Sequence, residues 1–388
     1  MVGPQPLELC ILVRIQVWQP RNLRMKSWQN IKNWYWHYER PISSISLLAG
    51  FVFDSIFLKR VDLFIENFWI VVHLLIAAIG IILLNLYEDR KIAEREKVPG
   101  RIHFWLIILM QFAFGGLYST FLVFYFRSAT LATSWPFLLL LAANLIANEA
   151  LKHHYSRLSF QISVLYISVF SFTIFFVPVV LHRIGPEIFI LSGLISLLLL
   201  GGFIHLLRLF TRERFHHSRR ILRWSIASIF IGINLLYFAN LIPPIPLALK
   251  DAGIYHAITR DANGDYQALA EPGDWRDFFR LYQPVQLVPG ESVYAFSAIF
   301  SPAKLDPDII HEWQNYDERA GKWLTNSRVE LPIIGGRDGG YRTYSIRNNL
   351  ADGKWRVNVE TKSGQLIGRI NFVVKTVAAE PTLITTTR

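Results

Sequence analysis

The chain contains little cysteine and little charge. Its 388 residues include one cysteine, Cys10, which excludes a disulfide-stapled domain and a multi-cysteine metal site. Charged residues make up 18% of the chain, against about 25% in an average soluble domain, and 52% of the chain is hydrophobic. The C-terminal half lacks Gly-x-Ser-x-Gly and a phosphate-binding Walker loop, so no catalytic motif stands out.

The positive charge is concentrated in the apolar part of the chain. Residues 1–249 carry 23 Lys and Arg against 12 Asp and Glu, whereas residues 250–388 carry 17 of each. A nucleic-acid-binding protein needs a basic stripe on a water-soluble face, so this distribution argues against nucleic acid as a partner. It is typical of a membrane protein with basic cytoplasmic loops, and the lipid bilayer is the first expected partner.

Seven apolar runs approach the roughly 20 residues that a helix needs to cross a bilayer. They are residues 42–58, 68–86, 102–126, 131–151, 158–181, 185–207 and 221–242. One such run alone would also fit a buried helix of a soluble protein. Seven in series, separated by short charged loops, predict a membrane all-α helical bundle of seven spanning helices over residues 42–242.

The basic loops also predict the orientation, because Lys and Arg are retained on the cytoplasmic side. One set of loops, residues 1–41, 87–101, 152–157 and 208–223, holds 19 Lys and Arg, and the opposite set, residues 59–67, 127–130 and 182–184, holds 4. We therefore expect a cytoplasmic N-terminus and, after seven crossings, a C-terminal domain on the outer side of the membrane.

The N-terminal segment, residues 1–41, shows no signal peptide. Residues 27–40 mix Trp and Tyr with Lys and Arg, which fits an amphipathic helix in the cytoplasmic interface or only an aromatic belt beside the first span. Residues 1–24 have no clear period. The natural start is accordingly either Met1 or Met25, and the intact mass of the native protein distinguishes them.

Beyond a Pro-rich connector at residues 243–252, the pattern changes from helical to alternating. Asn263-Gly264 lies between two alternating runs and predicts a hairpin, and six more short strands follow up to residue 376. In one of them Trp355, Val357 and Val359 share a face, which predicts a half-buried antiparallel strand. We expect an extracytoplasmic antiparallel β-sandwich over residues 253–376, immunoglobulin-like in the loose sense, and a flexible tail at residues 377–388.

Residues 290–375 resemble a bacterial family, the domain of unknown function 2914. The matching stretches are Val293-Tyr-Ala, His311-Glu-Trp313, Lys322-Trp323, Ile334-Gly-Gly-Arg337, Gly340-Tyr-Arg-Thr-Tyr344, Gly353-Lys-Trp-Arg-Val357 and Gly364-Gln-Leu-Ile-Gly368. The apolar half is similar to that of multi-pass membrane proteins that carry this domain, at Leu48–Asp54, Arg60–Asp62 and Ile242–His256. The resemblance implies a protein of the bacterial cytoplasmic (inner) membrane and brings no catalytic residue with it.

Polar side chains inside the apolar runs or just beyond their ends are candidate functional groups, because ionisable groups in hydrocarbon are unfavourable. The candidates are Asp54, Arg60, Asn144, Asn148, Glu149 and His153. Arg60 has the reach to pair with Asp54, and the Asn residues suit hydrogen bonding between helices. The alternative is an ion or proton site. No metal site and no cofactor is predicted.

Two further groups are candidate binding residues. The dense basic segment before the last span contributes Arg208, Arg212, Arg219 and Arg220, which suit anionic lipid headgroups or serve topology alone. In the β-region, Arg337, Tyr341, Arg342 and Tyr344 combine cations with aromatics, which suits stacking on sugars and pairing with acids. Alternatively, the aromatics form the sandwich core and the arginines its solvated face.

The sequence favours a membrane-anchored envelope protein whose outer β-domain binds an envelope glycan or another envelope protein, more in keeping with a binding protein than an enzyme. The rival is a transporter or intramembrane enzyme that uses Asp54 or Glu149 with His153, the β-domain being accessory. A signalling receptor would need a partner for its output, because the loops are too short to contain one.

Overall fold

The computed structural model describes residues 49–388 apart from a few short stretches. Those stretches are Lys59, Ser156, Asp306 and residues 95–99, 129–130, 151–153, 263–264, 274–279, 303–304 and 336–338. Gly50–Arg388 form one compact unit. The predicted cytoplasmic segment 1–41, with its interfacial helix and start site, lies outside the described residues.

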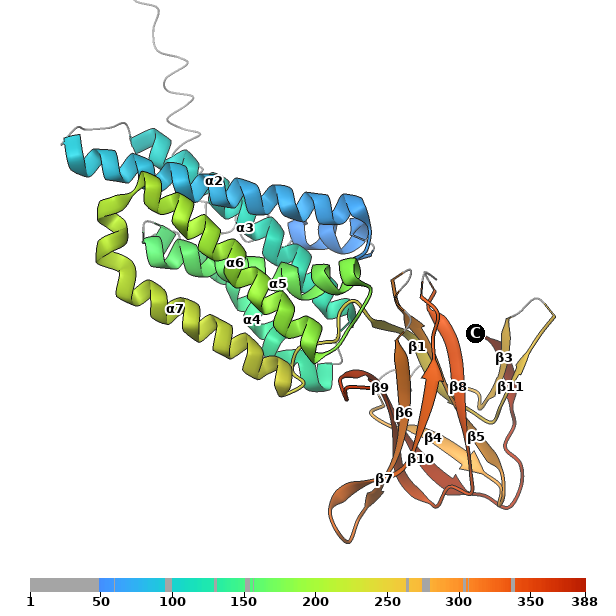
Figure 1. The fold of residues 1–388 in the computed structure, drawn as a ribbon. Coiled ribbons are helices and arrows are strands. Elements are labelled where there is room, and N and C mark those ends of the chain that lie inside the picture. Colours follow the sequence, from blue (N-terminus) through green and yellow to red (C-terminus); the bar gives the residue numbers. More distant parts are fainter. Residues whose placement is uncertain are drawn as a thin grey trace, which may run out of the picture. The chain divides into compact units, whose positions relative to one another are not determined.

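Helices occupy the first part of the described chain (Figure 1). They are a short helix at residues 49–57, α2 (Phe64–Glu94), α3 (Gly100–Ser128), α4 (Leu131–Ala150), α5 (Leu158–Leu181), α6 (Pro186–Phe210) and α7 (Arg212–Phe238). Within the described residues, five of them, α2, α3, α5, α6 and α7, are long and apolar enough to cross a membrane. Several long apolar helices of this kind indicate a membrane protein.

Two of the seven predicted spans are not confirmed. The apolar part of α4 is the shorter stretch Thr133–Asn148, and the run at 42–58 is helical only over residues 49–57 in the described chain. Among the described residues, five helices therefore qualify as candidate spans by length and composition.

The turn between α5 and α6 shows how the sequence ends one helix and starts the next. His182 adopts the left-handed conformation with φ of 52°, and its N–H donates to the carbonyl of Pro178. Gly185, with φ of 143°, precedes Pro186, the first residue of α6. A left-handed C-cap followed by proline at a helix start separates two antiparallel helices within a few residues.

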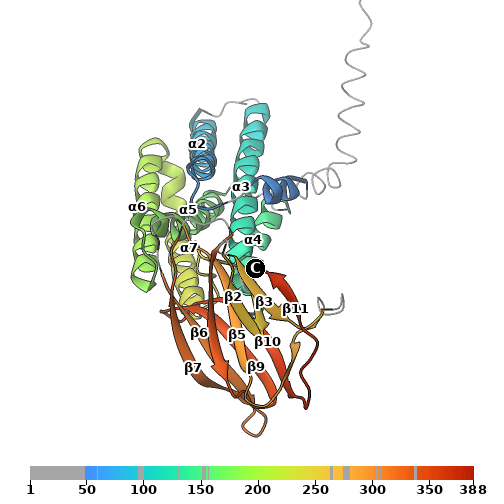
Figure 2. The same ribbon diagram turned by 90° about the vertical axis from the view of Figure 1, so that its right-hand side faces the viewer.

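The β-region is built from three sheets (Figure 2). Its strands are β1 (Ala248–Tyr255), β2 (Ala257–Arg260), β3 (Tyr266–Ala270), β4 (Gln283–Leu287), β5 (Ser292–Phe300), β6 (Asp308–Asp317), β7 (Lys322–Pro332), β8 (Tyr341–Asn348), β9 (Gly353–Thr361), β10 (Leu366–Thr376) and β11 (Ile384–Thr387). The strand orders are β1-β5-β8, β4-β10-β9-β6-β7 and β11-β3-β2. We call residues 248–388 the β-domain.

The first two sheets form a sandwich with an apolar core. Trp313, Trp355, Val357 and Phe372 of the five-stranded sheet are buried in one cluster with Val293 and other residues of the facing sheet. The ring of Trp313 meets that of Phe372 edge-on at 6.2 Å between centroids. The predicted sandwich and the predicted inward face of β9 are confirmed.

The third sheet covers the outer side of β5 and β8. Tyr255, Ile258 and Ala268 are buried there with Phe296 and Ala298 of β5. Strand β5 is thus buried on both faces, because alternate residues point into the two layers. The predicted hairpin is present as β2 and β3, but residues 384–387, expected in a flexible tail, pair with β3 as β11.

The connector is packed rather than exposed. Residues 242–247 are all buried, and Leu247 lies in a cluster with Ile299, Val359 and Ile367. Ile184, from the turn between α5 and α6, packs against this same cluster. Apolar side chains therefore hold the start of the β-domain at the end of the helices.

Candidate functional site

The outer face of the five-stranded sheet carries polar side chains in cross-strand rows. In one row the register places Arg328 of β7, Glu312 of β6, Asn358 of β9 and Arg369 of β10 opposite one another. These residues alternate with Trp313 and Val357, which point into the core, so the strand period puts them on the other face. We call this surface the polar sheet face.

Glu312 lies at the centre of the polar sheet face and is only 4% exposed. Its Oε1 accepts hydrogen bonds from Arg328 Nε at 3.0 Å and Nη2 at 2.8 Å, and from Thr325 Oγ1 at 3.0 Å. Its Oε2 accepts from Gln314 at 2.8 Å and Asn358 at 3.2 Å. Burial would raise the pKa of Glu312, but the bonds from Arg328, Thr325 and Asn358 outweigh it and hold the pKa below its usual value.

Glu360 differs from its neighbour Glu312 in having few partners. It is 8% exposed, and the interaction that the structure shows for it is an ion pair of 4.0 Å with Arg328. Burial, and next the charge of Glu312, raise the pKa of Glu360 to about 7. Two carboxyl groups on one surface therefore differ in protonation near neutral pH, one ionised and the other about half protonated.

Arginine and tryptophan complete the polar sheet face. The guanidinium of Arg356 lies 4.3 Å from the centroid of the Trp323 ring and donates to Gln314 Oε1 at 2.6 Å. Arg369 donates to Asn358 Oδ1 at 2.7 Å. When an arginine stacks on an indole, the N–H donors in the plane of its guanidinium remain available to a carboxylate or phosphate. The surface therefore combines stacking, cationic and hydroxyl-binding groups.

Behind this surface, a polar group inside the core is fully paired. His311 is 0% exposed, with Nε2 at 2.8 Å from Ser297 Oγ and Nδ1 at 2.9 Å from Ser345 Oγ. Trp313 Nε1 also donates to Ser345 Oγ at 2.9 Å. Burial lowers the pKa of His311 to about 4, so the ring is neutral. This geometry gives His311 a structural role in the core of the β-domain.

Of the four predicted binding residues of the β-domain, the three that the structure describes do not lie on one surface. Tyr341 packs with the core cluster of Leu247. Arg342 and Tyr344 lie on the other face of β8, where Arg342 pairs with Asp265 at 2.8 Å and Tyr344 contacts Tyr266. The third sheet thus engages both side chains. Arg337 lies outside the described residues.

The predicted polar residues of the helices have different neighbours. Asp54 faces Ser119 of α3 and His73 of α2. Arg60 pairs with Asp62, its Nε lying 2.9 Å from Oδ1. The side chain of Glu149 and the whole of His153 lie outside the described residues.

The asparagines of α4 bond to backbone carbonyls. Asn144 donates to Leu140 O at 2.7 Å. Asn148 donates to Gln111 O at 2.9 Å, and Gln111 donates to Asn148 O at 3.1 Å. This reciprocal pair joins α3 to α4.

Sequence reasoning did not identify the polar sheet face. Its strand alternation was visible, since Glu312 and Gln314 flank Trp313, and Arg356 and Asn358 flank Val357. The missing information was the register that brings β6, β7, β9 and β10 side by side. Among the described residues, no three His, Cys, Asp or Glu side chains are grouped as metal ligands would be.

Comparison with known proteins confirms the family resemblance of the β-domain. Residues 306–374, which include β6 to β9 and most of β10, match the family described as Protein of unknown function (DUF2914). No curated protein matches the chain.

Two solved structures are similar to parts of this chain. An immunoglobulin-like protein from Pseudomonas aeruginosa is 12% identical, with 33% of this chain and 96% of that chain covered and a TM-score of 0.20. An alkylpurine DNA glycosylase from Pseudomonas fluorescens is 8% identical, with 80% of this chain and 99% of that chain covered and a TM-score of 0.20.

Proposed function

We propose that this protein is anchored in the bacterial inner membrane and that its β-domain binds an acidic glycan of the envelope through the polar sheet face. The observation that carries the proposal is Arg356 stacked on Trp323 beside the bonded row of Arg328, Glu312, Asn358 and Arg369. An envelope protein is the other partner class that such a face suits.

The proposed orientation places the N-terminus inside and the β-domain outside. It is supported by the bias of 19 Lys and Arg against 4 between the two sets of loops. It requires seven crossings, so α4 and the segment that contains the helix at 49–57 must also span. The 20 residues of α4 are about 30 Å long, which matches the hydrocarbon core.

An acidic glycan fits the chemistry of the polar sheet face. Arginine pairs with carboxylate or phosphate through two parallel N–H donors. The Trp323 ring offers a flat apolar surface to a sugar ring, and Gln314 and Asn358 offer amide groups to hydroxyls. Arg328, Arg356 and Arg369 place three guanidinium groups on this face, and they are the groups that would bind an anion.

The test is co-sedimentation of the detergent-solubilised full chain with isolated peptidoglycan sacculi, and separately its binding to alginate and to neutral dextran. We expect sacculi and alginate to bind and dextran to fail. Trp323→Ala, which removes the stacking surface, and Arg356→Gln, which removes one charge-assisted contact, should each weaken binding about tenfold. Arg260→Gln, the same charge change on exposed β2, is the matched control.

Two results would contradict this function. One is binding of wild type to none of the acidic polymers, and the other is equal weakening by Arg260→Gln and Arg356→Gln, which would indicate only diffuse charge attraction.

The rival function, a transporter or intramembrane enzyme, is favoured by one observation. Asp54, His73 and Ser119 come together from the short helix, α2 and α3. Under this alternative, Asp54→Asn abolishes function in cells while Arg356→Gln leaves it intact. The glycan-binding proposal requires the reverse.

A further inference from the structure

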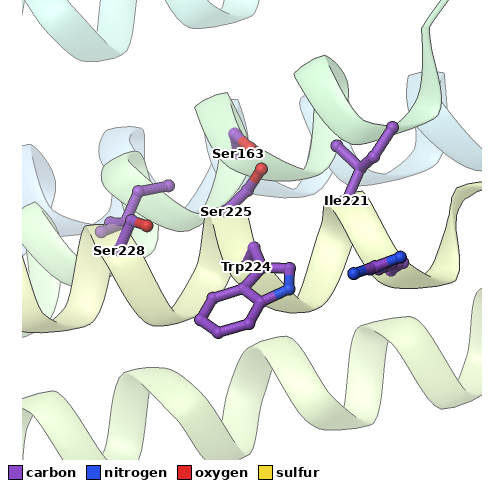
Figure 3. Close-up of a pocket in the computed structure, with 7 residues that line it drawn as sticks. Ser163, Ile221, Trp224, Ser225 and Ser228 are labelled. Carbon is purple, nitrogen blue, oxygen red and sulfur yellow. The ribbon is translucent and has the colours of Figure 1, made fainter.

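A groove opens along α7 on the side that meets α5. Its volume is about 560 Å³, and Figure 3 shows Ser163 of α5 next to Ser225 of α7, with Ser228 further along α7. Arg220 and Trp224 also line it. The groove is therefore a hollow between two helices with small hydroxyl residues along its length and a cation among its lining residues.

The side chains along this groove change in order from a cation to an indole and then to small residues. Arg220, Trp224 and Ser228 follow one another at four-residue intervals, so they lie on one side of α7. Gly232 continues the row, and a Cβ added there would meet no atom within 4 Å. Arg220 and Ser228 are about 12 Å apart along the helix axis, close to the ~15 Å half-thickness of a bilayer's hydrocarbon core.

The cationic end of the groove has no counter-charge in the described part of the chain. Arg220, which lines the groove, and its neighbours Arg219 and Arg223, which do not, are all exposed, and no described residue pairs with them. Trp224, one turn further along, is 68% exposed, as suits an indole at a membrane interface. Only 17% of the apolar window of α7 is buried, against 67% for α5, so this side of α7 is left uncovered.

We propose that the groove binds one anionic phospholipid, with its phosphate at Arg220 and an acyl chain along Ser225 and Ser228. The order of cation, indole and small residues matches the order of headgroup, interface and chain in a lipid. The proposal rests on the proposed insertion of α5 and α7 in a membrane and does not depend on what the β-domain binds.

Charge decides between a lipid and a second copy of this chain. A two-fold dimer through α7 would bring the same patch of each subunit together. Arg219, Arg220 and Arg223 of one subunit would then approach the same cations of its partner. An anionic headgroup neutralises these charges instead, so the lipid is the favoured occupant.

The test is native mass spectrometry of the full chain in detergent with added phosphatidylglycerol or phosphatidylcholine. Wild type should retain one phosphatidylglycerol and little phosphatidylcholine. Arg220→Gln should lower phosphatidylglycerol retention about fivefold, the factor that matches about 1 kcal/mol per basic residue near an anionic surface. Arg223→Gln, the same change outside the groove lining, is the control and should have a smaller effect.

A second variant fills the groove without changing charge. Ser225→Leu should reduce retention of phosphatidylglycerol although Arg220 is intact. The proposal is overturned if Arg220→Gln and Arg223→Gln act equally, if phosphatidylcholine is retained as well as phosphatidylglycerol, or if inorganic phosphate displaces the lipid at millimolar concentration. A lipid-free dimer that Ser225→Leu dissociates would assign the groove to a second copy. Failure of sacculus binding leaves this result unaffected, so the two proposals fail separately.

Discussion

Polar side chains are satisfied differently in the helices and in the β-domain. In the helices they donate mainly to backbone carbonyls, as Asn144 does to Leu140 and Ser192 does to Ile188. In the β-domain they bond to one another across strands, as Glu312 does with Arg328 and Asn358. The helical pattern suits a medium without water, where every polar group needs a nearby acceptor.

This difference separates polar residues that bond within a helix from polar residues that we propose bind a ligand. A side chain bonded to its own helix depends on few other side chains. A side chain in a cross-strand row depends on several, as Glu312 does on Arg328, Thr325 and Asn358. Three predictions test the contrast, two in the β-domain and one in the helices.

The largest expected effect concerns the buried histidine of the β-domain core. Because burial lowers the pKa of His311 to about 4 from the ordinary 6.5, only the unfolded chain takes up this proton between those values. The contribution of neutral His311 to the free energy of unfolding is therefore fully present above pH 6.5 and is lost as the pH falls towards 4. A shift of this size corresponds to about 3 kcal/mol of unfolding free energy, measurable by urea unfolding followed by near-UV circular dichroism.

The His311 experiment is cleanest in a Glu360→Gln background, which removes the neighbouring carboxyl that titrates in the same window. His311→Gln in that background is the matched control and should show a flatter dependence between pH 7 and 4. Glu312, whose pKa is lowered, titrates in both proteins and cancels. Equal slopes with and without His311 would refute its role.

The strand pattern predicts one face of β9 well and the other poorly. Trp355, Val357 and Val359 alternate as a core face should, and they are at most 3% exposed. The intervening Asn358 and Glu360 look solvated in sequence, yet they are 6% and 8% exposed. Side chains of neighbouring strands bury them. The sequence of a single strand does not determine which residues of other strands lie beside it.

Other features were hidden for similar reasons. The strand β11 exists only because β3 offers an open edge to Ile384–Thr387, which alone look like a polar tail. The helical runs were easier to predict from the sequence, because the length and apolar character of each segment do not depend on other segments. Local patterns therefore located α2, α3, α5, α6 and α7, while long-range pairing determined the polar sheet face.

A smaller effect of opposite sign is expected on the polar sheet face. The pKa of Glu360 is raised to about 7. The contribution of its protonated form to the free energy of unfolding is therefore fully present below about pH 4.5 and is lost as the pH rises through 7. Glu360→Gln stays neutral and should therefore stabilise the protein at pH 8 by about 1–2 kcal/mol, allowing for solvent screening. At pH 5 the variant and wild type should be nearly equal.

The control for Glu360 is Glu330→Gln, an exposed carboxyl on β7 that lies in the same cross-strand row as Glu360, with Ile310 between them. Its stability difference from wild type should not change between pH 5 and 8. If Glu330→Gln stabilises at pH 8 as much as Glu360→Gln does, general charge explains the effect, and the coupling between Glu312 and Glu360 is absent.

The smallest expected effect is in the helices, where Tyr118→Phe removes a buried hydroxyl. Tyr118 donates to Val164 O at 3.0 Å, and Ser168 donates to the same carbonyl at 2.9 Å. Because Ser168 still satisfies the carbonyl in the variant, the loss should be about 0.5–1 kcal/mol, measured by thermal unfolding in detergent. Tyr118→Phe with Ser168→Ala should lose more than the two single changes together. A single-variant loss above about 2 kcal/mol would mean that helical hydroxyls are as interdependent as the polar sheet face, and the contrast would fail.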